Sequence, residues 1–201
     1  MTDLSLEDRR LLVGSVGQLS TGWWAMLFII ITEAAIFAFL QFSYYYIAVQ
    51  QTLGTWPPPN GTPELTLSLP NTIILILSSV VLWWGERAIK RGERTKHLVG
   101  LGVAFLLGAI FVAVQLLEWR DKPFTYASSS YGSLFFIITG FHMAHVIAGL
   151  IMLFFLFVWS AMGYFDSRRN APVTIGAFYW HFVDVVWICV FFSLYVTPHL
   201  G

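Results

Sequence analysis

Long stretches in which apolar residues occupy every face of a helix recur five times along the chain. They run from about residue 23 to 49, 70 to 89, 97 to 117, 133 to 159 and 175 to 197. A helix of about 20 apolar residues crosses the ~30 Å hydrocarbon core of a bilayer. The strands of a membrane barrel would alternate apolar and polar residues, and these runs do not. The pattern predicts an all-α, polytopic membrane protein, a bundle of five transmembrane helices.

The segment before the first span differs from the rest in being charged. Residues 1–22 carry acidic and basic side chains, and the span that follows is too long for the apolar region of a signal peptide. We therefore expect residues 1–22 to stay as a cytoplasmic N-terminal segment, followed by a transmembrane domain over 23–201. At the second span, Pro70 is expected in the first helical turn and Trp83 and Trp84 at the membrane interface.

Lysine and arginine are distributed unevenly between the two sides of the predicted bundle. Nine of the eleven lie in the N-terminal segment or in the loops after the second and fourth spans, whereas Arg120 and Lys122 lie on the other side. Cytoplasmic loops carry an excess of these residues. The distribution predicts a cytoplasmic N-terminus and a C-terminus on the opposite side of the membrane. We expect this membrane to be the bacterial inner membrane, so the C-terminus would be periplasmic.

Composition narrows the classes of function. The chain is 57% hydrophobic and 11% charged with zero net charge, so it has no basic field that would gather nucleic acid. A single cysteine, Cys189, excludes a disulfide framework and any metal centre that needs two thiolates. The chain has no glycine-rich phosphate loop and no nucleophile motif.

Ionisable residues within the spans are the candidates for function. Glu33, Asp184 and His142 fall at similar depths near the bilayer midplane, where an ionised side chain costs at least ~2.5 kcal/mol. Glu33 has no cationic neighbour in its own helix. It is either a carboxyl that titrates or a protonated group that donates a hydrogen bond to a neighbouring helix.

Two pairs of polar residues are spaced by three positions, so each pair lies on one helix face. His142 and His145 would need further ligands to hold a metal, and we expect none; interhelical hydrogen bonds, for instance to Glu33, are the preferred interpretation. His181 and Asp184 are expected to form a local charge-assisted pair. A proton relay is the alternative for this second pair, but no chain of titratable groups in the sequence links it to a surface.

Glu118 follows the third span beside Trp119 and Arg120. A solvated acid at the membrane interface is the expected interpretation there.

Two strings resemble known signatures: GFHMAHV at residues 140–146 and YWHFVDVVW at 179–187 are similar to motifs of subunit III of haem-copper cytochrome oxidases. Glu33 resembles the glutamate of that family's first matching helix. Trp56-Pro57-Pro58 and Pro123-Phe124-Thr125 resemble its loops. The resemblance covers about residues 23–195 and suggests a short, five-helix form of the cytochrome c oxidase subunit.

The resemblance implies a non-catalytic subunit without haem or copper of its own, in an oxidoreductase complex that translocates protons. Its partners would be the catalytic haem-copper subunit I, other oxidase subunits and phospholipids held in a cleft. It would sustain proton uptake and protect the catalytic subunit from inactivation. Longer members of the family have seven helices, and this chain begins where the third would be. Either another subunit supplies the first two or the groove is open.

Other functions stay open. The same family includes subunits of quinol oxidases and a protein associated with nitric-oxide reductase, but the strings around Trp56 and Pro123 look more like the cytochrome c oxidase branch. A small ion transporter could use Glu33 and Asp184 as midplane ion sites. Transporters of that kind usually have broken or paired helices, which the sequence pattern does not show.

Overall fold

The computed structural model describes residues 20–51, 56–58 and 65–199, and these residues form an all-helical bundle without a strand. Five helices are long and apolar enough to span a membrane, as the sequence predicts. They are α1 (Thr21–Gln50), α2 (Leu65–Lys90), α3 (Arg94–Asp121), α4 (Ser130–Met162) and α5 (Ala171–Phe191). Most of the predicted N-terminal segment lies outside the described residues.

Each helix begins before and most end after the predicted span, because polar residues continue the helices beyond the apolar core. The Ser20 hydroxyl accepts a hydrogen bond from the Trp23 amide and so caps α1, and Ser129 caps α4 through the Gly132 amide. Gly163 ends α4 at a φ of 87°, where a side chain would be strained. The prediction for Pro70 is wrong, because α2 begins at Leu65 and places this proline one turn inside the helix.

The end of the fifth span departs from regular α-helix. After Phe191 the chain forms a short π-helix, Phe192–Val196, and then a 3-10 turn, Thr197–His199. Ser193, Leu194 and Tyr195 are buried in the π-helical turn. This turn positions the Tyr195 hydroxyl beside polar groups of α3.

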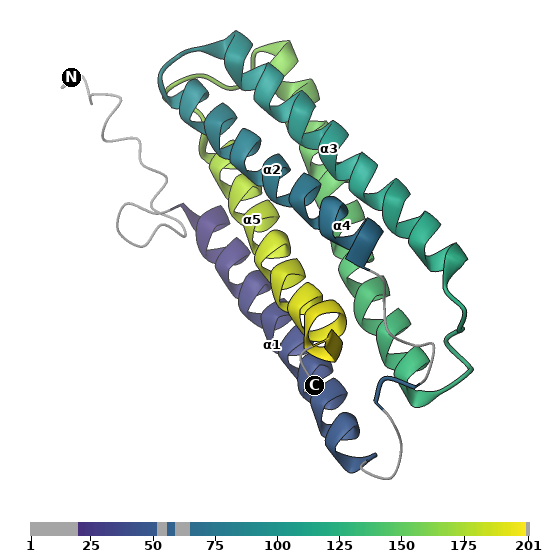
Figure 1. Ribbon diagram of the computed structural model, residues 1–201. Coiled ribbons are helices and arrows are strands. Elements are labelled where there is room, and N and C mark those ends of the chain that lie inside the picture. Colours follow the sequence, from purple (N-terminus) through teal and green to yellow (C-terminus); the bar gives the residue numbers. More distant parts are fainter. Residues whose placement is uncertain (1–19, 52–55, 59–64, 200–201) are drawn as a thin grey trace, which may run out of the picture.

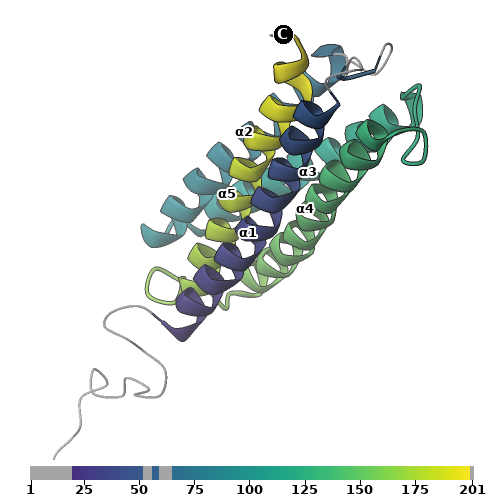
Figure 2. The same ribbon diagram turned by 90° about the horizontal axis from the view of Figure 1, so that it is seen from below.

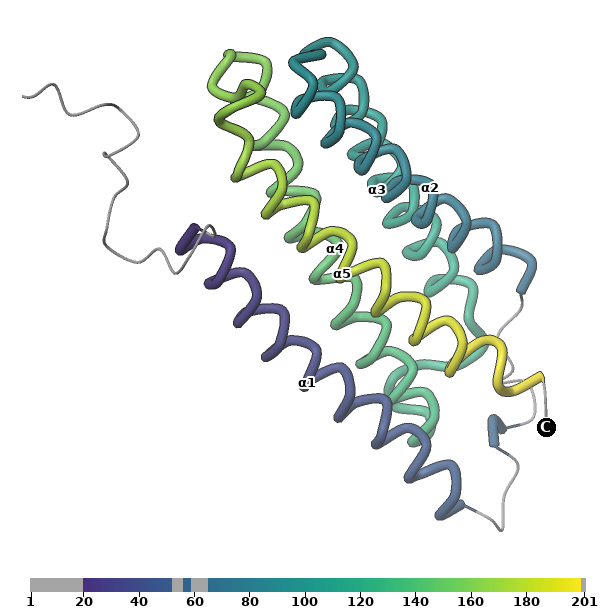
Figure 3. The backbone as a smooth tube through the Cα atoms, turned by 90° about the vertical axis from the view of Figure 1, so that its left-hand side faces the viewer, coloured from purple at the N-terminus to yellow at the C-terminus, as the bar shows by residue number. Residues whose placement is uncertain are grey.

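The helices form three layers. α1 lies on one flank, α4 and α5 occupy the middle, and α2 and α3 form the other flank (Figures 1 and 3). α1 contacts only the middle layer to any extent and lies over α4 and α5 (Figure 2). Of its 30 residues, only Phe37 and Tyr44 are buried, so this long apolar helix is covered on one narrow face.

The α2–α3 hairpin is the closest helix pair because two glycines meet at its crossing. A Cβ on Gly100 would lie 2.7 Å from the Cα of Gly85. His97 fixes the same end of the bundle: its Nδ1 lies 3.0 Å from the Gly85 carbonyl and its Nε2 lies 2.9 Å from the Ser160 hydroxyl. One buried imidazole therefore joins α2, α3 and α4.

α5 is the central helix, and its tryptophans fill spaces left by small residues. The Trp180 ring lies against Gly108 of α3 and Gly149 of α4, where an added Cβ would come within 2.7 Å of it. Its indole N–H donates to the Ser78 hydroxyl of α2 at 3.0 Å, and Trp187 donates to Thr72 at 2.9 Å. Buried hydrogen bonds thus fix the register between α2 and α5.

The antiparallel helix order places the start of α1 and the end of the described chain at opposite ends of the bundle (Figure 1). The α2–α3 and α4–α5 loops lie at the end where α1 begins. The α3–α4 loop and His199 lie at the other end.

Candidate functional site

The first sequence-predicted site residue, Glu33, lies on α1 about 18 Å along the helix from Thr21, which is near mid-bundle. Its Oε2 is 3.0 Å from Nε2 of His145 on α4. Phe37, one turn on from Glu33, packs edge-on against the His145 ring with 5.1 Å between ring centroids. The structure thus brings together two ionisable residues that are 112 positions apart in the chain.

The hydrogen bonds of His145 define how the pair holds a proton. Its Nδ1 lies 2.8 Å from the carbonyl oxygen of Phe141, and because a carbonyl can only accept, Nδ1 must carry a hydrogen. Nε2 then either accepts from a protonated Glu33 or, as imidazolium, donates to a carboxylate. In both states one proton lies between Glu33 and His145 and the pair is neutral overall.

Neutrality explains how the pair is tolerated at this depth. An ionised carboxyl alone at the helix centre would cost at least ~2.5 kcal/mol on insertion scales, and pairing within a neutral couple lowers that cost. The side chains are 29% exposed at Glu33 and 13% exposed at His145. The proton between them is therefore reachable from the outer face of α1 and α4 rather than sealed in the core.

His142 is placed differently from the prediction, which gave it an interhelical hydrogen bond. Its ring is buried, and neither nitrogen has a hydrogen-bond partner among the described residues. The ring lies 4.7 Å from the Trp187 ring, centroid to centroid, and packs edge-on against Phe111 and Phe37. Phe37 of α1 contacts both rings, but His142 lies deeper in the bundle against Trp187 and Phe111, where aromatic rings surround its nitrogens, whereas His145 reaches Glu33.

His181 and Asp184 do not form the predicted local pair. The Nδ1 atom of His181 lies 2.9 Å from the Ser79 hydroxyl of α2. Ser79 is also the polar neighbour of the Asp184 carboxyl, yet neither carboxyl oxygen has a well-formed hydrogen bond in the described part of the chain. The facing helix supplies a better-placed partner for His181 than its own helix does, so the interhelical contact replaces the local one.

Glu118 is not the solvated interfacial acid that the sequence indicates. Its side chain is 5% exposed and forms a 2.8 Å ion pair with Lys122, which is 8% exposed. The Gln115 amide donates to Glu118 at 3.2 Å and lies 3.5 Å from the Tyr195 hydroxyl. The π-helical turn after α5 covers this end of α3, and that long-range packing buries a residue that is terminal in its own helix.

The loops at the opposite end carry exposed acids that are held by hydrogen bonds or an ion pair. Asp166 accepts backbone hydrogen bonds from Arg168 and Arg169 at 2.7 and 2.8 Å, and these bonds lower the pKa of its carboxyl. Lys96 lowers the pKa of Glu93 in the α2–α3 turn. These exposed acids define the local shape of the loops.

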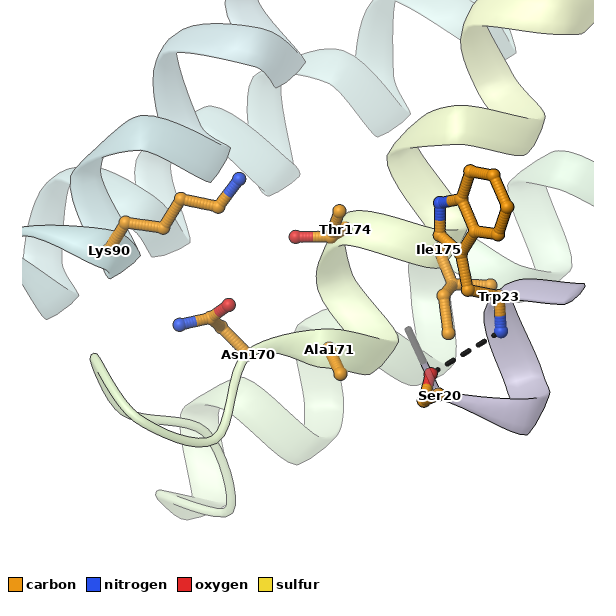
Figure 4. Close-up of a pocket in the computed structure, with 7 residues that line it drawn as sticks. All are labelled: Ser20, Trp23, Lys90, Asn170, Ala171, Thr174 and Ile175. Carbon is orange, nitrogen blue, oxygen red and sulfur yellow. Dashed lines mark hydrogen bonds between the residues drawn. The ribbon is translucent and has the colours of Figure 1, made fainter. Parts of the chain in front are cut away.

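A pocket of about 300 Å³ lies where the starts of α1 and α5 meet the end of α2 (Figure 4). Its lining residues are Ser20, Trp23, Lys90, Asn170, Ala171, Thr174 and Ile175. The Lys90 side chain extends toward Thr174, and both residues contact Oε1 of the buried Glu86. The pocket combines an ammonium group, the positive end of the α5 dipole and an indole at the membrane edge.

Sequence reasoning did not single out several residues that organise these sites. Ser79 contacts His181, while Ser78 and Thr72 receive the tryptophan N–H groups of α5. Lys122 neutralises Glu118. A signal was available for the α2 residues, because four hydroxyl or amide side chains interrupt its apolar run at Asn71, Thr72, Ser78 and Ser79 and imply polar partners on a facing helix.

The described residues include no group of three or more histidine, cysteine, aspartate or glutamate side chains placed to hold a metal ion. His142 and His145 point toward different neighbours.

Comparison with known proteins adds the family. A sequence profile described as "Cytochrome c oxidase subunit III" matches residues 17–198. Proteins named "Cytochrome c oxidase subunit 3" are similar over 177 residues in Petromyzon marinus (37% identical), Cyprinus carpio (36%) and Homo sapiens (35%). Each alignment covers 86% of this chain and 68% of the relative. The chain is therefore a member of the cytochrome c oxidase subunit III family.

Proposed function

We propose that the chain is a non-catalytic subunit of an aerobic haem-copper oxidase that supports proton uptake and the stability of the catalytic subunit. Haem and copper belong to partner subunits in this proposal, chiefly the catalytic subunit I. The electron donor is cytochrome c, as the names of the relatives suggest. Membership in this family favours the respiratory role over a small ion transporter.

The observation that carries the proposal is the contact between Glu33 and His145. The pair holds one proton at mid-bundle, stays neutral, and keeps part of its surface open on the least covered helix. A neighbouring subunit that covers α1 would meet this proton directly. Proton handling or a local electrostatic effect on that neighbour follows from such a placement.

The isosteric variant Glu33→Gln tests this role. Glutamine keeps the shape and one hydrogen bond but removes the labile proton. We expect the complex to assemble normally while oxygen consumption per haem falls severalfold, its pH profile changes, or it inactivates faster during turnover. The matched control is Glu93→Gln, which alters an exposed glutamate in a loop and should leave all three unchanged. Unchanged turnover and inactivation in Glu33→Gln would reduce the pair to a packing contact.

We also propose that the chain holds phospholipid, with a headgroup at the pocket of Figure 4. Lys90 and the start of α5 favour an anionic phosphate, and Trp23 lies at the level where indoles meet headgroups. Acyl chains would then follow the exposed apolar face of α1.

Native mass spectrometry of the purified complex tests the lipid proposal. Lys90→Gln should release one anionic phospholipid that the wild type retains. Lys96→Gln is the control, because Lys96 also pairs with a glutamate on its own helical end but does not line the pocket. Equal lipid retention in both variants would contradict the assignment.

We propose that the α2–α3 and α4–α5 loops face the cytoplasm, or the equivalent compartment, on the strength of their lysine and arginine content. The named relatives come from vertebrates, so they do not support the expected bacterial compartment. The proposal therefore concerns only which loops face which side of the membrane that contains the oxidase.

A further inference from the structure

The seam between α2 and α5 contains a second ionisable site, separate from the Glu33–His145 pair. Asp184 lies about 20 Å along α5 from Ala171, and its side chain is buried with 5% of the residue exposed. Neither of its oxygens, nor Nε2 of His181, has a hydrogen-bond partner among the described residues. Buried polar atoms are nearly always satisfied, so these three unpaired atoms favour a small ligand that hydrogen-bonds to them.

The hydrogen-bonding capacities identify that ligand. Ser79 contributes one hydroxyl hydrogen and contacts Nδ1 of His181, so protein atoms alone leave Nε2 and both carboxyl oxygens unpaired. Water supplies both donors and acceptors, and a buried water needs two to four polar partners, which these three residues offer. A cation would require more oxygen ligands than the seam presents in the described region.

The site has an opening. A groove of about 390 Å³ runs along the outer face of α2 and α5 and is lined by Ser79, Val80, Trp83 and His181. Ser79 and His181 line the groove, and Ser79 is also the polar neighbour of the Asp184 carboxyl. A water molecule held in the groove can therefore reach the buried carboxyl through the Ser79 hydroxyl.

We propose that Asp184 is a reversible proton-binding site whose proton exchanges with water held by Ser79 and His181 in the α2–α5 groove. On protonation, a hydronium ion formed on a groove water gives its proton to a carboxylate oxygen of Asp184 and leaves neutral water. On release, the carboxyl gives that proton back to a water molecule. Ser79 and water then donate hydrogen bonds to the carboxylate, while Nδ1–H of His181 donates to the Ser79 hydroxyl.

The charged surroundings bear on this equilibrium. Among the helices packed against α5, α2 carries Glu86, Arg87 and Lys90 near its end. α1 carries Glu33 and three tyrosines, Tyr44, Tyr45 and Tyr46, and α4 carries Tyr131, His142 and His145. Glu86 acts electrostatically on His181, and it is itself neutralised by Lys90. Glu33 and His145 neutralise each other. The dominant influence on Asp184 is therefore its burial beside neutral partners.

Infrared spectroscopy of the full chain in lipid nanodiscs tests the proposal without a mutation at the site. Asp184 is the only aspartate in a predicted span, because Asp3, Asp8, Asp121 and Asp166 lie in termini, loops or a helix end. Labelling with ¹³C-aspartate therefore separates a buried aspartyl carbonyl band from glutamyl bands. We expect a labelled band from the protonated carboxyl that disappears reversibly as the pH rises from about 5 to about 9. Buried carboxyls in proteins titrate within this range.

Variants test which residue gives the band and how water reaches that residue. Asp184→Asn should abolish the labelled band, and Glu33→Gln should leave it unchanged. The band therefore tests the Asp184 proposal independently of the function proposed for Glu33. Should Asp184→Asn fail to fold, Ser79→Ala should still shift the band. Val80→Trp, which fills the groove, should slow hydrogen–deuterium exchange of the carboxyl severalfold, whereas Val99→Trp on the exposed face of α3 should not. A band that stays constant at every pH, or never appears, would overturn the proposal, and equal exchange rates in both tryptophan variants would overturn the access route.

Discussion

At the scale of single residues, two of the acids inside the bundle lie beside a basic side chain. Glu33 pairs with His145 across two helices, and Glu118 pairs with Lys122 one turn further along the chain. The sequence shows where each acid lies along its helix, but it does not show which side chains surround that acid in the bundle. Whether an acid near a helix end is solvated depends on what covers that end, and here the π-helical turn containing Tyr195 does so.

The Glu118–Lys122 pair yields a prediction about stability. Lys122→Met removes the cation and leaves a buried carboxyl unpaired, which should destabilise the chain by about 3–5 kcal/mol, the usual cost of breaking a buried pair. The double variant Glu118→Gln, Lys122→Met should recover most of that loss, because neither charge remains. Thermal unfolding in detergent measures both, and a single variant as stable as the wild type would show that the pair is solvated.

At the scale of helices, close approach depends on glycine at specific positions. α2 and α3 cross where Gly85 and Gly100 meet backbone to backbone, and α5 inserts Trp180 against Gly108 and Gly149. Five long apolar runs are readable from hydropathy. The pairing of these runs is not, because lipid is as apolar as the helices and the choice of partner depends on small residues and hydroxyls.

The crossing glycines give a matched pair of variants. Gly100→Ala would place a Cβ 2.7 Å from the Gly85 Cα and force α2 and α3 apart, with a loss of about 1–3 kcal/mol, as in overpacked cores. Gly102→Ala should be nearly silent, because its Cβ would make an ordinary 3.5 Å contact with Phe157. Thermal stability of the two variants compares them directly, and equal stability would argue against the tight crossing.

The α4–α5 loop should respond to pH. Folding lowers the pKa of Asp166 through the Arg168 and Arg169 amides, so its stabilising effect is complete above the ordinary aspartate pKa and is lost as pH falls through the lowered value. Hydrogen exchange at these two amides, corrected for intrinsic rates, should lose protection on acidification. In Asp166→Asn this pH dependence should vanish, and its persistence would assign the effect to another group.

At the scale of the whole molecule, the sequence predicts the fold well and the sites only in outline. The five-helix, all-α architecture and the family follow from hydropathy and from two motif strings. The motif residues then diverge in role: Trp180 packs in the core, His181 contacts α2, and His142 is enclosed by aromatic rings. A single chain without aligned relatives does not indicate which helix each motif face meets, so these contacts required the structure.

The bundle also predicts a topology. A cysteine at Asp166 in the α4–α5 loop and one at Tyr126 in the α3–α4 loop should react with a membrane-impermeant thiol reagent from opposite sides of intact vesicles. Cys189, which is exposed on the surface of α5, would be replaced by serine beforehand. Labelling of both cysteines from one side would contradict the five-span topology.

Purification of the affinity-tagged chain from its native membranes tests directly whether this protein works as a subunit of a haem-copper oxidase. We expect a complex that contains a haem-bearing chain in stoichiometric amount, oxidises cytochrome c and reduces oxygen, while the chain expressed alone shows no visible absorption. A chain that purifies from native membranes without any haem-bearing partner would contradict it.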